Sequence, residues 1–98
     1  MAVQSGSAAS NAEDLAKSVL IWMAEDPDRI GAMLAQTGTA PQDLRALSQD
    51  PGFLGGVLDL LLQDEAALIA FCDATQTPYD QPARARQALP GGDTPHWT

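Results

Sequence analysis

The chain has 98 residues, and its thirteen acidic residues against five lysines and arginines give a formal net charge of −8. This length allows one domain at most. The charge argues against a general affinity for nucleic acid or anionic membranes, because phosphate neutralisation needs clustered basic side chains. Hydrophobic residues make up 45% of the sequence, which is not the composition of an acidic disordered segment.

The expected folded domain lies in the middle of the chain. Residues 1–9 are small and polar without periodicity, and we expect them to be disordered. Residues 10–76 carry the helical pattern of a domain. Residues 77–98 form a tail rich in proline and glycine that is compatible with one short helix. A core of this size is near the lower limit for independent folding and leaves little material for a deep catalytic cleft.

The cysteine content and the N-terminus indicate a cytoplasmic protein. Cys72 is the single cysteine, so no internal disulfide can form. The N-terminus has no positively charged start followed by an apolar stretch, so no signal peptide is apparent. The longest apolar runs, 19–24 and 66–72, fall well short of the roughly 20 residues that span a bilayer. We expect a monomer or weak dimer without membrane association.

Hydrophobic periodicity is helical throughout and predicts an all-α fold. The first helix is expected to start near Asn11, within a capping box, and to end near Glu25. It ends there because Pro27 disfavours the α conformation in the residue before it. Asp26 is then the predicted N-cap of a second helix, and Gly38 is predicted to end that helix in the left-handed conformation.

The second half of the chain repeats these helix-start signals. Residues 39–42 form another capping box, with Pro41 in the first turn of a third helix. Asp50-Pro51 repeats the corner of the second helix and opens a fourth. Asp64 is the predicted N-cap of a fifth helix. Residues 80–89 are compatible with a last short helix.

The fourth helix is the most apolar element of the chain. Its apolar residues cover about half of its circumference at ~100° per residue, which suggests a central helix touched by several others. They are Phe53, Leu54, Val57, Leu58, Leu60, Leu61 and Leu62. Almost no loop residues separate the helices at Asp26-Pro27, Asp50-Pro51 and Gln63-Asp64, which favours steep crossings over an up-down bundle. The sequence therefore predicts a compact orthogonal array of four to five short helices.

No pattern of catalytic or metal-binding residues stands out in the sequence. Cys72 falls on the core face of the fifth helix, and the only histidine, His96, lies in the tail. We interpret Cys72 as a small buried residue rather than a nucleophile. The acidic groups at Asp26 and Asp64 straddle helix starts, where carboxylates cap free N–H groups. We expect no enzymatic activity, no cofactor and no metal site.

Gly55, Gly56 and Asp59 form a candidate partner-binding strip on the fourth helix. Glycine within a helix costs about 0.5–1 kcal/mol relative to alanine, so glycines at this place invite a reason. A strip without bulky side chains would let a partner helix, or the chain's own tail, lie against the helix. The alternative is an exposed and slightly weak helix start.

The leading functional hypothesis is a non-enzymatic interaction or regulatory module that binds an unknown protein partner through a helical surface. It rests on the lack of catalytic motifs and on the Gly55, Gly56 and Asp59 strip. The alternative is a nucleic-acid-associated domain, since short helices joined by sharp corners can resemble a helix-turn-helix unit. The net charge of −8 disfavours this alternative.

Several segments occur in an order that is similar to a known family. They are Ile21–Asp26, Leu34–Gly38, Asp43–Arg45, Asp50–Glu65, Phe71 and Ala88–Gly91. Over Ala12–Gly91 the chain resembles a family of short bacterial proteins, mostly alphaproteobacterial, that is catalogued only as a domain of unknown function. Thr39 stands where this family usually has an apolar residue, and Leu60 where an aromatic is common, which implies local repacking. The resemblance implies an all-helical bacterial protein and no particular activity.

Overall fold

The computed structural model describes residues 8–89, and they form six α-helices and one short 3-10 helix without any strand. The elements are α1 (Ala8–Ala24), α2 (Pro27–Thr37), η1 (Pro41–Asp43), α3 (Leu44–Leu47), α4 (Pro51–Gln63), α5 (Glu65–Thr75) and α6 (Gln81–Gln87). The predicted all-α fold is confirmed. The N-terminus predicted to be disordered, residues 1–9, lies outside the described residues except for Ala8 and Ala9.

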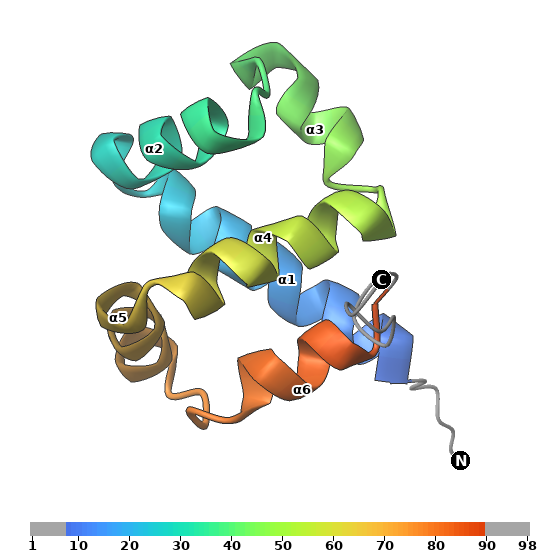
Figure 1. Cartoon of the computed structure of the whole chain (residues 1–98), viewed down its shortest axis with the longest axis vertical. Coiled ribbons are helices and arrows are strands. Elements are labelled where there is room, and N and C mark those ends of the chain that lie inside the picture. The colour runs from blue at the N-terminus through green and yellow to red at the C-terminus, as the bar shows by residue number, and fades with distance from the viewer. Residues whose placement is uncertain (1–7, 90–98) are drawn as a thin grey trace, which may run out of the picture.

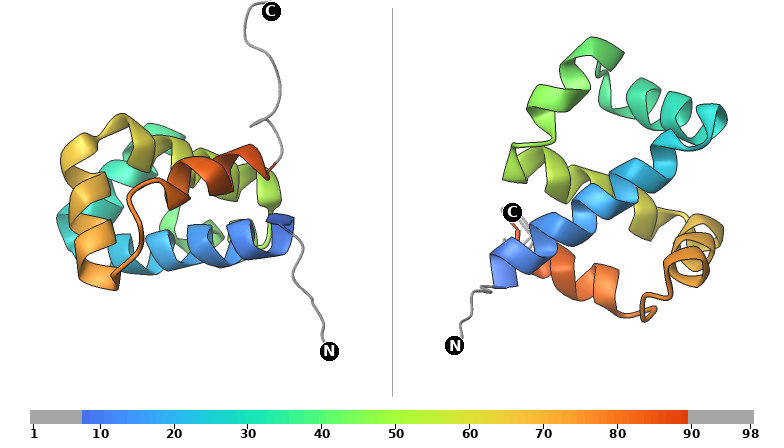
Figure 2. Two further views of the ribbon diagram at one scale, coloured as in Figure 1. Left: turned by 90° about the horizontal axis from the view of Figure 1, so that it is seen from below. Right: turned by 180° about the vertical axis from the view of Figure 1, so that it is seen from behind.

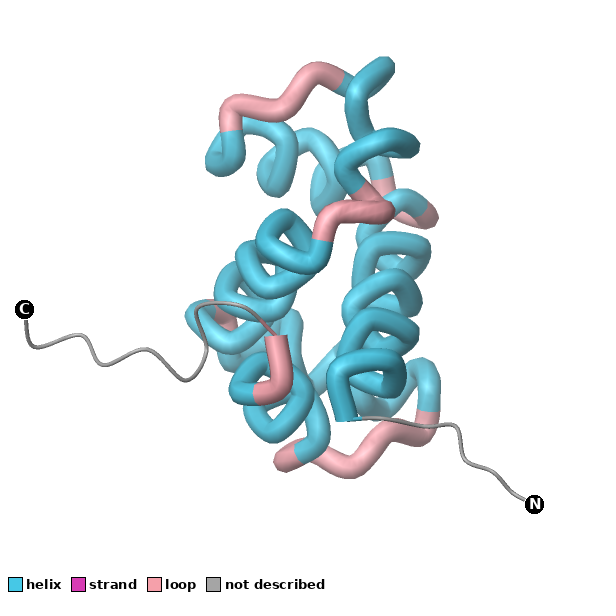
Figure 3. The backbone as a smooth tube through the Cα atoms, turned by 90° about the vertical axis from the view of Figure 1, so that its right-hand side faces the viewer, coloured by secondary structure: helices cyan, strands magenta, loops and turns pink. Residues whose placement is uncertain are grey.

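The helices are arranged around a crossing of α1 and α4 (Figure 1). On one side of this crossing lie α2, η1 and α3, and on the other lie α5 and α6. In the same view α5 is seen nearly end-on while α4 runs across the picture, so consecutive helices turn sharply. Loops between them are short (Figure 3). This arrangement is the orthogonal array that the abrupt corners predict.

Three aspartates fix the helix starts at these corners, as predicted. The Asp26 carboxylate accepts a hydrogen bond from the Asp28 N–H at 2.9 Å, and the Asp50 carboxylate accepts one from the Gly52 N–H at 2.9 Å. The Asp64 carboxylate accepts one from the Ala67 N–H at 3.2 Å. Each bond satisfies an N–H group that has no partner within its own helix. The chain can therefore leave one helix and begin the next with hardly any loop between them.

The start of α1 differs from the prediction. The helix begins at Ala8, so the capping box near Asn11 lies inside it. Ala8 and Ala9 are residues of the highest helix propensity, and they extend the helix beyond the box.

The start of the third helix also differs from the prediction. Thr39 does not cap it; the N-cap of η1 is Ala40, which makes no side-chain cap hydrogen bond. Thr39 belongs instead to the closure of α2. Its N–H donates to the Leu34 carbonyl at 3.0 Å, and its hydroxyl accepts from the Thr37 hydroxyl at 2.7 Å. Gly38 provides the predicted left-handed residue, with φ at 69°.

The core is built mainly on α1 and α4. Fully buried side chains of α4 are Leu54, Val57, Leu58 and Leu61, which confirms its predicted central place. Ala16 and Val19 meet them from α1, and Phe71 meets them from α5. The core is continuous through these three helices.

The short helix expected in the C-terminal tail is α6, and it packs against both α1 and α4 (Figure 2). Pro82, Ala85 and Leu89 are buried at its contacts. Pro82 and Ala85 lie three residues apart on one side of α6, and Leu89 follows just after the helix ends. The compact helical unit therefore runs on to Leu89.

Two residues with positive φ allow a test of this backbone. Gln76 ends α5 with φ at 57°, and Gly38 ends α2 with φ at 69°. A side chain costs about 1–2 kcal/mol in this conformation, whereas glycine adopts it freely. We expect Gln76→Gly to raise the free energy of unfolding by about 0.5–1 kcal/mol and Gly38→Ala to lower it by about 1 kcal/mol. Urea denaturation measures both, and a loss of stability in Gln76→Gly would contradict the assigned backbone.

Candidate functional site

The structure places part of the Gly55, Gly56 and Asp59 strip inside the molecule. Gly55 is buried and Gly56 is half-buried, and a Cβ added at Gly56 would meet no atom within 4 Å. The Asp59 carboxylate accepts two hydrogen bonds from Arg86 of α6, from Nε at 2.6 Å and from Nη2 at 3.0 Å. Helix α6 thus lies over the Asp59 end of the strip. Partner binding at Gly56 stays a prediction.

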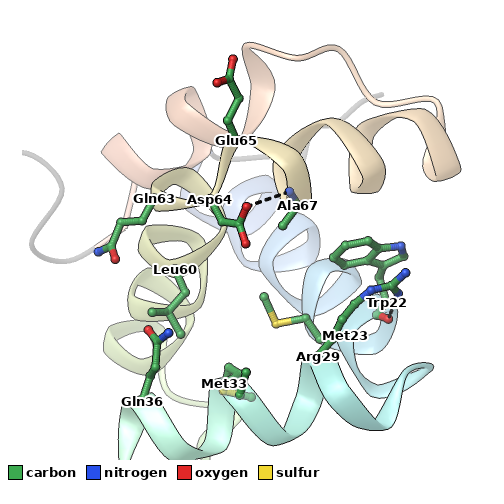
Figure 4. Close-up of a pocket in the computed structure, with 11 residues that line it drawn as sticks. Trp22, Met23, Arg29, Met33, Gln36, Leu60, Gln63, Asp64, Glu65 and Ala67 are labelled. Carbon is green, nitrogen blue, oxygen red and sulfur yellow. Dashed lines mark hydrogen bonds between the residues drawn. The ribbon is translucent and has the colours of Figure 1, made fainter.

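A groove of about 420 Å³ opens elsewhere, between α2 and the C-terminal end of α4 (Figure 4). We call it the α2–α4 groove. From α2 it is lined by residues at the spacing of one helix face, Arg29, Ala32, Met33 and Gln36. The other lining residues are Trp22 and Met23 of α1, Leu60 and Gln63 of α4, and Asp64, Glu65 and Ala67 at the start of α5.

The groove has an apolar floor and a polar rim. Met23 and Met33 are buried at 7% and 3% exposure, and Leu60 is half-buried beside them. Gln36 and Gln63 are exposed on its two long sides. In Figure 4 the Met23 and Leu60 side chains project into the space between α2 and α4. Apolar surface at the bottom and hydrogen-bonding groups at the edge are the usual make-up of a protein-binding patch.

Trp22 forms the wall at one end of the groove and joins three helices. Its ring meets the Phe71 ring of α5 edge to face, with centroids 5.7 Å apart. The Arg29 guanidinium of α2 stacks on the Trp22 ring, with Cζ 3.9 Å from the ring centroid. Arg29 also donates from Nη1 to the Trp22 carbonyl at 3.2 Å. These contacts fix where α2 and α5 stand relative to the end of α1.

The charges of the groove differ between its α2 side and its α5 side. Arg29 of α2 lies 3.8 Å from the Asp26 carboxylate, so its positive charge has a partner within the molecule. On the α5 side, Asp64 and Glu65 are exposed. Within residues 8–89, no ion pair joins either of these carboxylates to a cation.

Cys72 lies where the sequence predicts, in the core. It is 1% exposed, and its Sγ lies 3.8 Å from the Pro78 carbonyl oxygen. Burial, and then the nearby Asp73 carboxylate, raise the pKa of the Cys72 thiol above its ordinary value of 9.0. A thiol held in its protonated form is a poor nucleophile. His96 lies outside the described residues.

Two further features concern the described part of the chain. Among residues 8–89, no group of histidine, cysteine and acidic side chains is arranged to hold a metal ion. None of the helices in that range combines the length and the apolar character needed to cross a membrane.

Hydrophobic periodicity places the residues of the groove floor on the apolar faces of their helices: Met23 on that of α1, Met33 on that of α2 and Leu60 on that of α4. This pattern does not distinguish a groove floor from the core. What sequence does not reveal is that α2 packs chiefly against α1 and leaves its Arg29–Gln36 face open toward α4. The sequence carries one small signal of this: the polar and small residues Arg29, Ala32 and Gln36 share that helix face with Met33.

The Asp59–Arg86 pair should contribute measurably to stability. We expect Arg86→Ala to lower the free energy of unfolding by about 1–2 kcal/mol, a value between those of exposed and buried pairs, because Arg86 is mostly buried and Asp59 only half. Asp59→Arg places like charges together and should cost more. Thermal unfolding measures these changes. The exchanged variant Asp59→Arg/Arg86→Asp should recover part of the loss, and no recovery would contradict a direct pairing.

Cys72 should be protected from alkylation in the folded protein. At pH 8 we expect iodoacetamide to modify it at least about tenfold more slowly in the native state than in urea, because the raised pKa and burial withhold the thiolate. The stabilising effect of this protonated thiol is present below its ordinary pKa and is lost as pH rises through the raised value. Equal rates in both states would show that Cys72 is accessible.

Comparison with known proteins identifies a family. A family model described as "Protein of unknown function (DUF3572)" matches residues 9–92. Because the match covers most of the sequence, the chain belongs to this family, which confirms the expected resemblance to a domain of unknown function. No curated protein and no solved structure gives a significant match.

Proposed function

We propose that the chain is a non-enzymatic, cytoplasmic interaction module that binds an amphipathic helical segment of another protein in the α2–α4 groove. The observation that carries this proposal is the open groove with a methionine and leucine floor between two helices. A helix laid between α2 and α4 would bury its apolar face on that floor, in the way that helix-in-groove complexes form.

The openness of the groove favours a partner helix over a small ligand. Ala32 and Gln36 of α2 and Gln63 of α4 are all exposed at its rim. Small ligands usually have 70–90% of their surface buried in their sites. The α2–α4 groove is open to solvent and would cover a small ligand on one side only. A partner protein can bury the other side of a bound helix with its own residues.

The length of the groove and the flexibility of its methionine side chains suit an occupant of two helical turns. From Arg29 to Gln36 the α2 face rises over roughly 10 Å, about two helical turns. Met23 and Met33 have unbranched, polarisable side chains that can adapt to the shape of an apolar partner. Both features support a helical segment with two or three apolar anchors as the occupant.

A variant on the rim of the groove tests this proposal. Ala32→Gln keeps a good helix former on α2 and extends a neutral side chain across the groove. Ala35→Gln is the matched control, because Ala35 is exposed on the same helix but does not line the groove. In affinity capture from lysate of the source organism, we expect a stoichiometric partner that wild type and Ala35→Gln retain and that Ala32→Gln loses.

Photo-crosslinking locates the partner independently. A photoreactive residue at Gln36, on the groove rim, should crosslink to the captured partner, whereas one at Gln42 on η1 should not. Retention of the partner by Ala32→Gln, or crosslinking from Gln42 alone, would place binding elsewhere on the molecule and overturn the proposal.

A further inference from the structure

The charges around the α2–α4 groove bear on what its occupant carries. The floor residues Met23, Met33 and Leu60 provide apolar contact but do not favour either sign of charge. The ionisable side chains on the groove lining are Arg29 on the α2 side and Asp64 and Glu65 on the α5 side. These three residues therefore set the sign of charge that each side presents to a partner.

On the α2 side, the Arg29 guanidinium already has partners within the molecule. Arg29 is held by the Trp22 ring at 3.9 Å, by the Trp22 carbonyl at 3.2 Å and by the Asp26 carboxylate at 3.8 Å. A guanidinium with this many partners offers little to an incoming anion. The α2 side is therefore close to neutral toward a partner.

On the α5 side, the lining residues include Asp64 and Glu65, and no cation within residues 8–89 pairs with either carboxylate. Asp64 uses Oδ1 to cap α5, and no hydrogen bond within residues 8–89 engages its Oδ2. Glu65 follows directly and is exposed, and in Figure 4 its side chain points away from the groove floor. The positive end of the α5 dipole, about half an elementary charge, offsets only part of these two negative charges.

We infer that the occupant of the α2–α4 groove is a basic amphipathic helix whose apolar face covers the methionine floor and whose lysine or arginine side chains meet Asp64 and Glu65. This inference rests on the proposed function and specifies the chemistry of the partner. The net charge of −8 adds long-range attraction for a basic segment and speeds its association. The two carboxylates then set the position of the lysine or arginine side chains in the bound complex.

The test uses two synthetic helical peptides as probes, with fluorescence anisotropy of the labelled peptide as the readout. One carries leucines along one face with lysines beside them, and the other has glutamates in place of the lysines. The full-length wild-type protein should bind the lysine peptide at least about tenfold more tightly than the glutamate peptide. Raising the salt concentration should reduce this preference, because exposed charges are screened.

A pair of double variants tests whether Asp64 and Glu65 cause the preference for the lysine peptide. Asp64→Asn/Glu65→Gln removes both charges and keeps an efficient N-cap, because asparagine caps as well as aspartate. Glu13→Gln/Asp14→Asn removes the same net charge from the far half of α1. We expect the first variant to lose most of the preference for lysine and the second to retain most of it.

Each outcome separates this inference from the proposed function. If both peptides bind with similar affinity and Ala32→Gln abolishes this binding, the groove is still a site for a helix. Its preference for a basic helix is then wrong. An equal loss of preference in both double variants would show that only the total charge matters, which also overturns the role of Asp64 and Glu65. No groove-dependent binding of either peptide would overturn both proposals.

Discussion

The contacts of Trp22 are the interaction on which the shape of this molecule depends. Its ring lies at the end of α1, where Phe71 of α5 meets it edge to face and Arg29 of α2 stacks upon it. Through this one side chain, α2 and α5 are held at set positions around the end of α1. Because α4 joins directly to α5 through Asp64, the position of α5 also fixes the end of α4. The α2–α4 groove is the space that remains between these elements.

Two neighbouring faces of α4, at Asp59 and at Leu60, have different environments in the structure. The Asp59 side of α4 is closed by α6, which anchors Pro82, Ala85 and Leu89 in the core and adds the Arg86 ion pair. The Leu60 side faces α2 and stays open. These two neighbouring residues point to different sides of the helix, so one face of α4 completes the fold while the next is left accessible. This open apolar face is the surface that we propose for a partner helix.

The sequence predicted the local structure well because its signals are local. Asp26, Asp50 and Asp64 cap their helices as expected, and Gly38 closes α2. The two errors at helix starts came from capping patterns that other local effects outweigh, namely the propensity of Ala8 and the closure of α2 by Thr39. The groove could not be predicted, since it depends on how far α2 stands from α4. That distance is set by packing at Trp22, between residues distant in the sequence, and no periodicity reports it.

The most direct test of the groove as a binding site is NMR of the protein labelled with carbon-13 at the methionine methyl groups. Met23 and Met33 both line the groove floor, so their methyl signals report on its occupation. If a basic amphipathic helix binds in the α2–α4 groove, both signals should shift on addition of the lysine peptide, in proportion to its saturation. If the peptide binds and both signals stay in place, the groove is not the binding site, and the proposed helix-in-groove function is wrong.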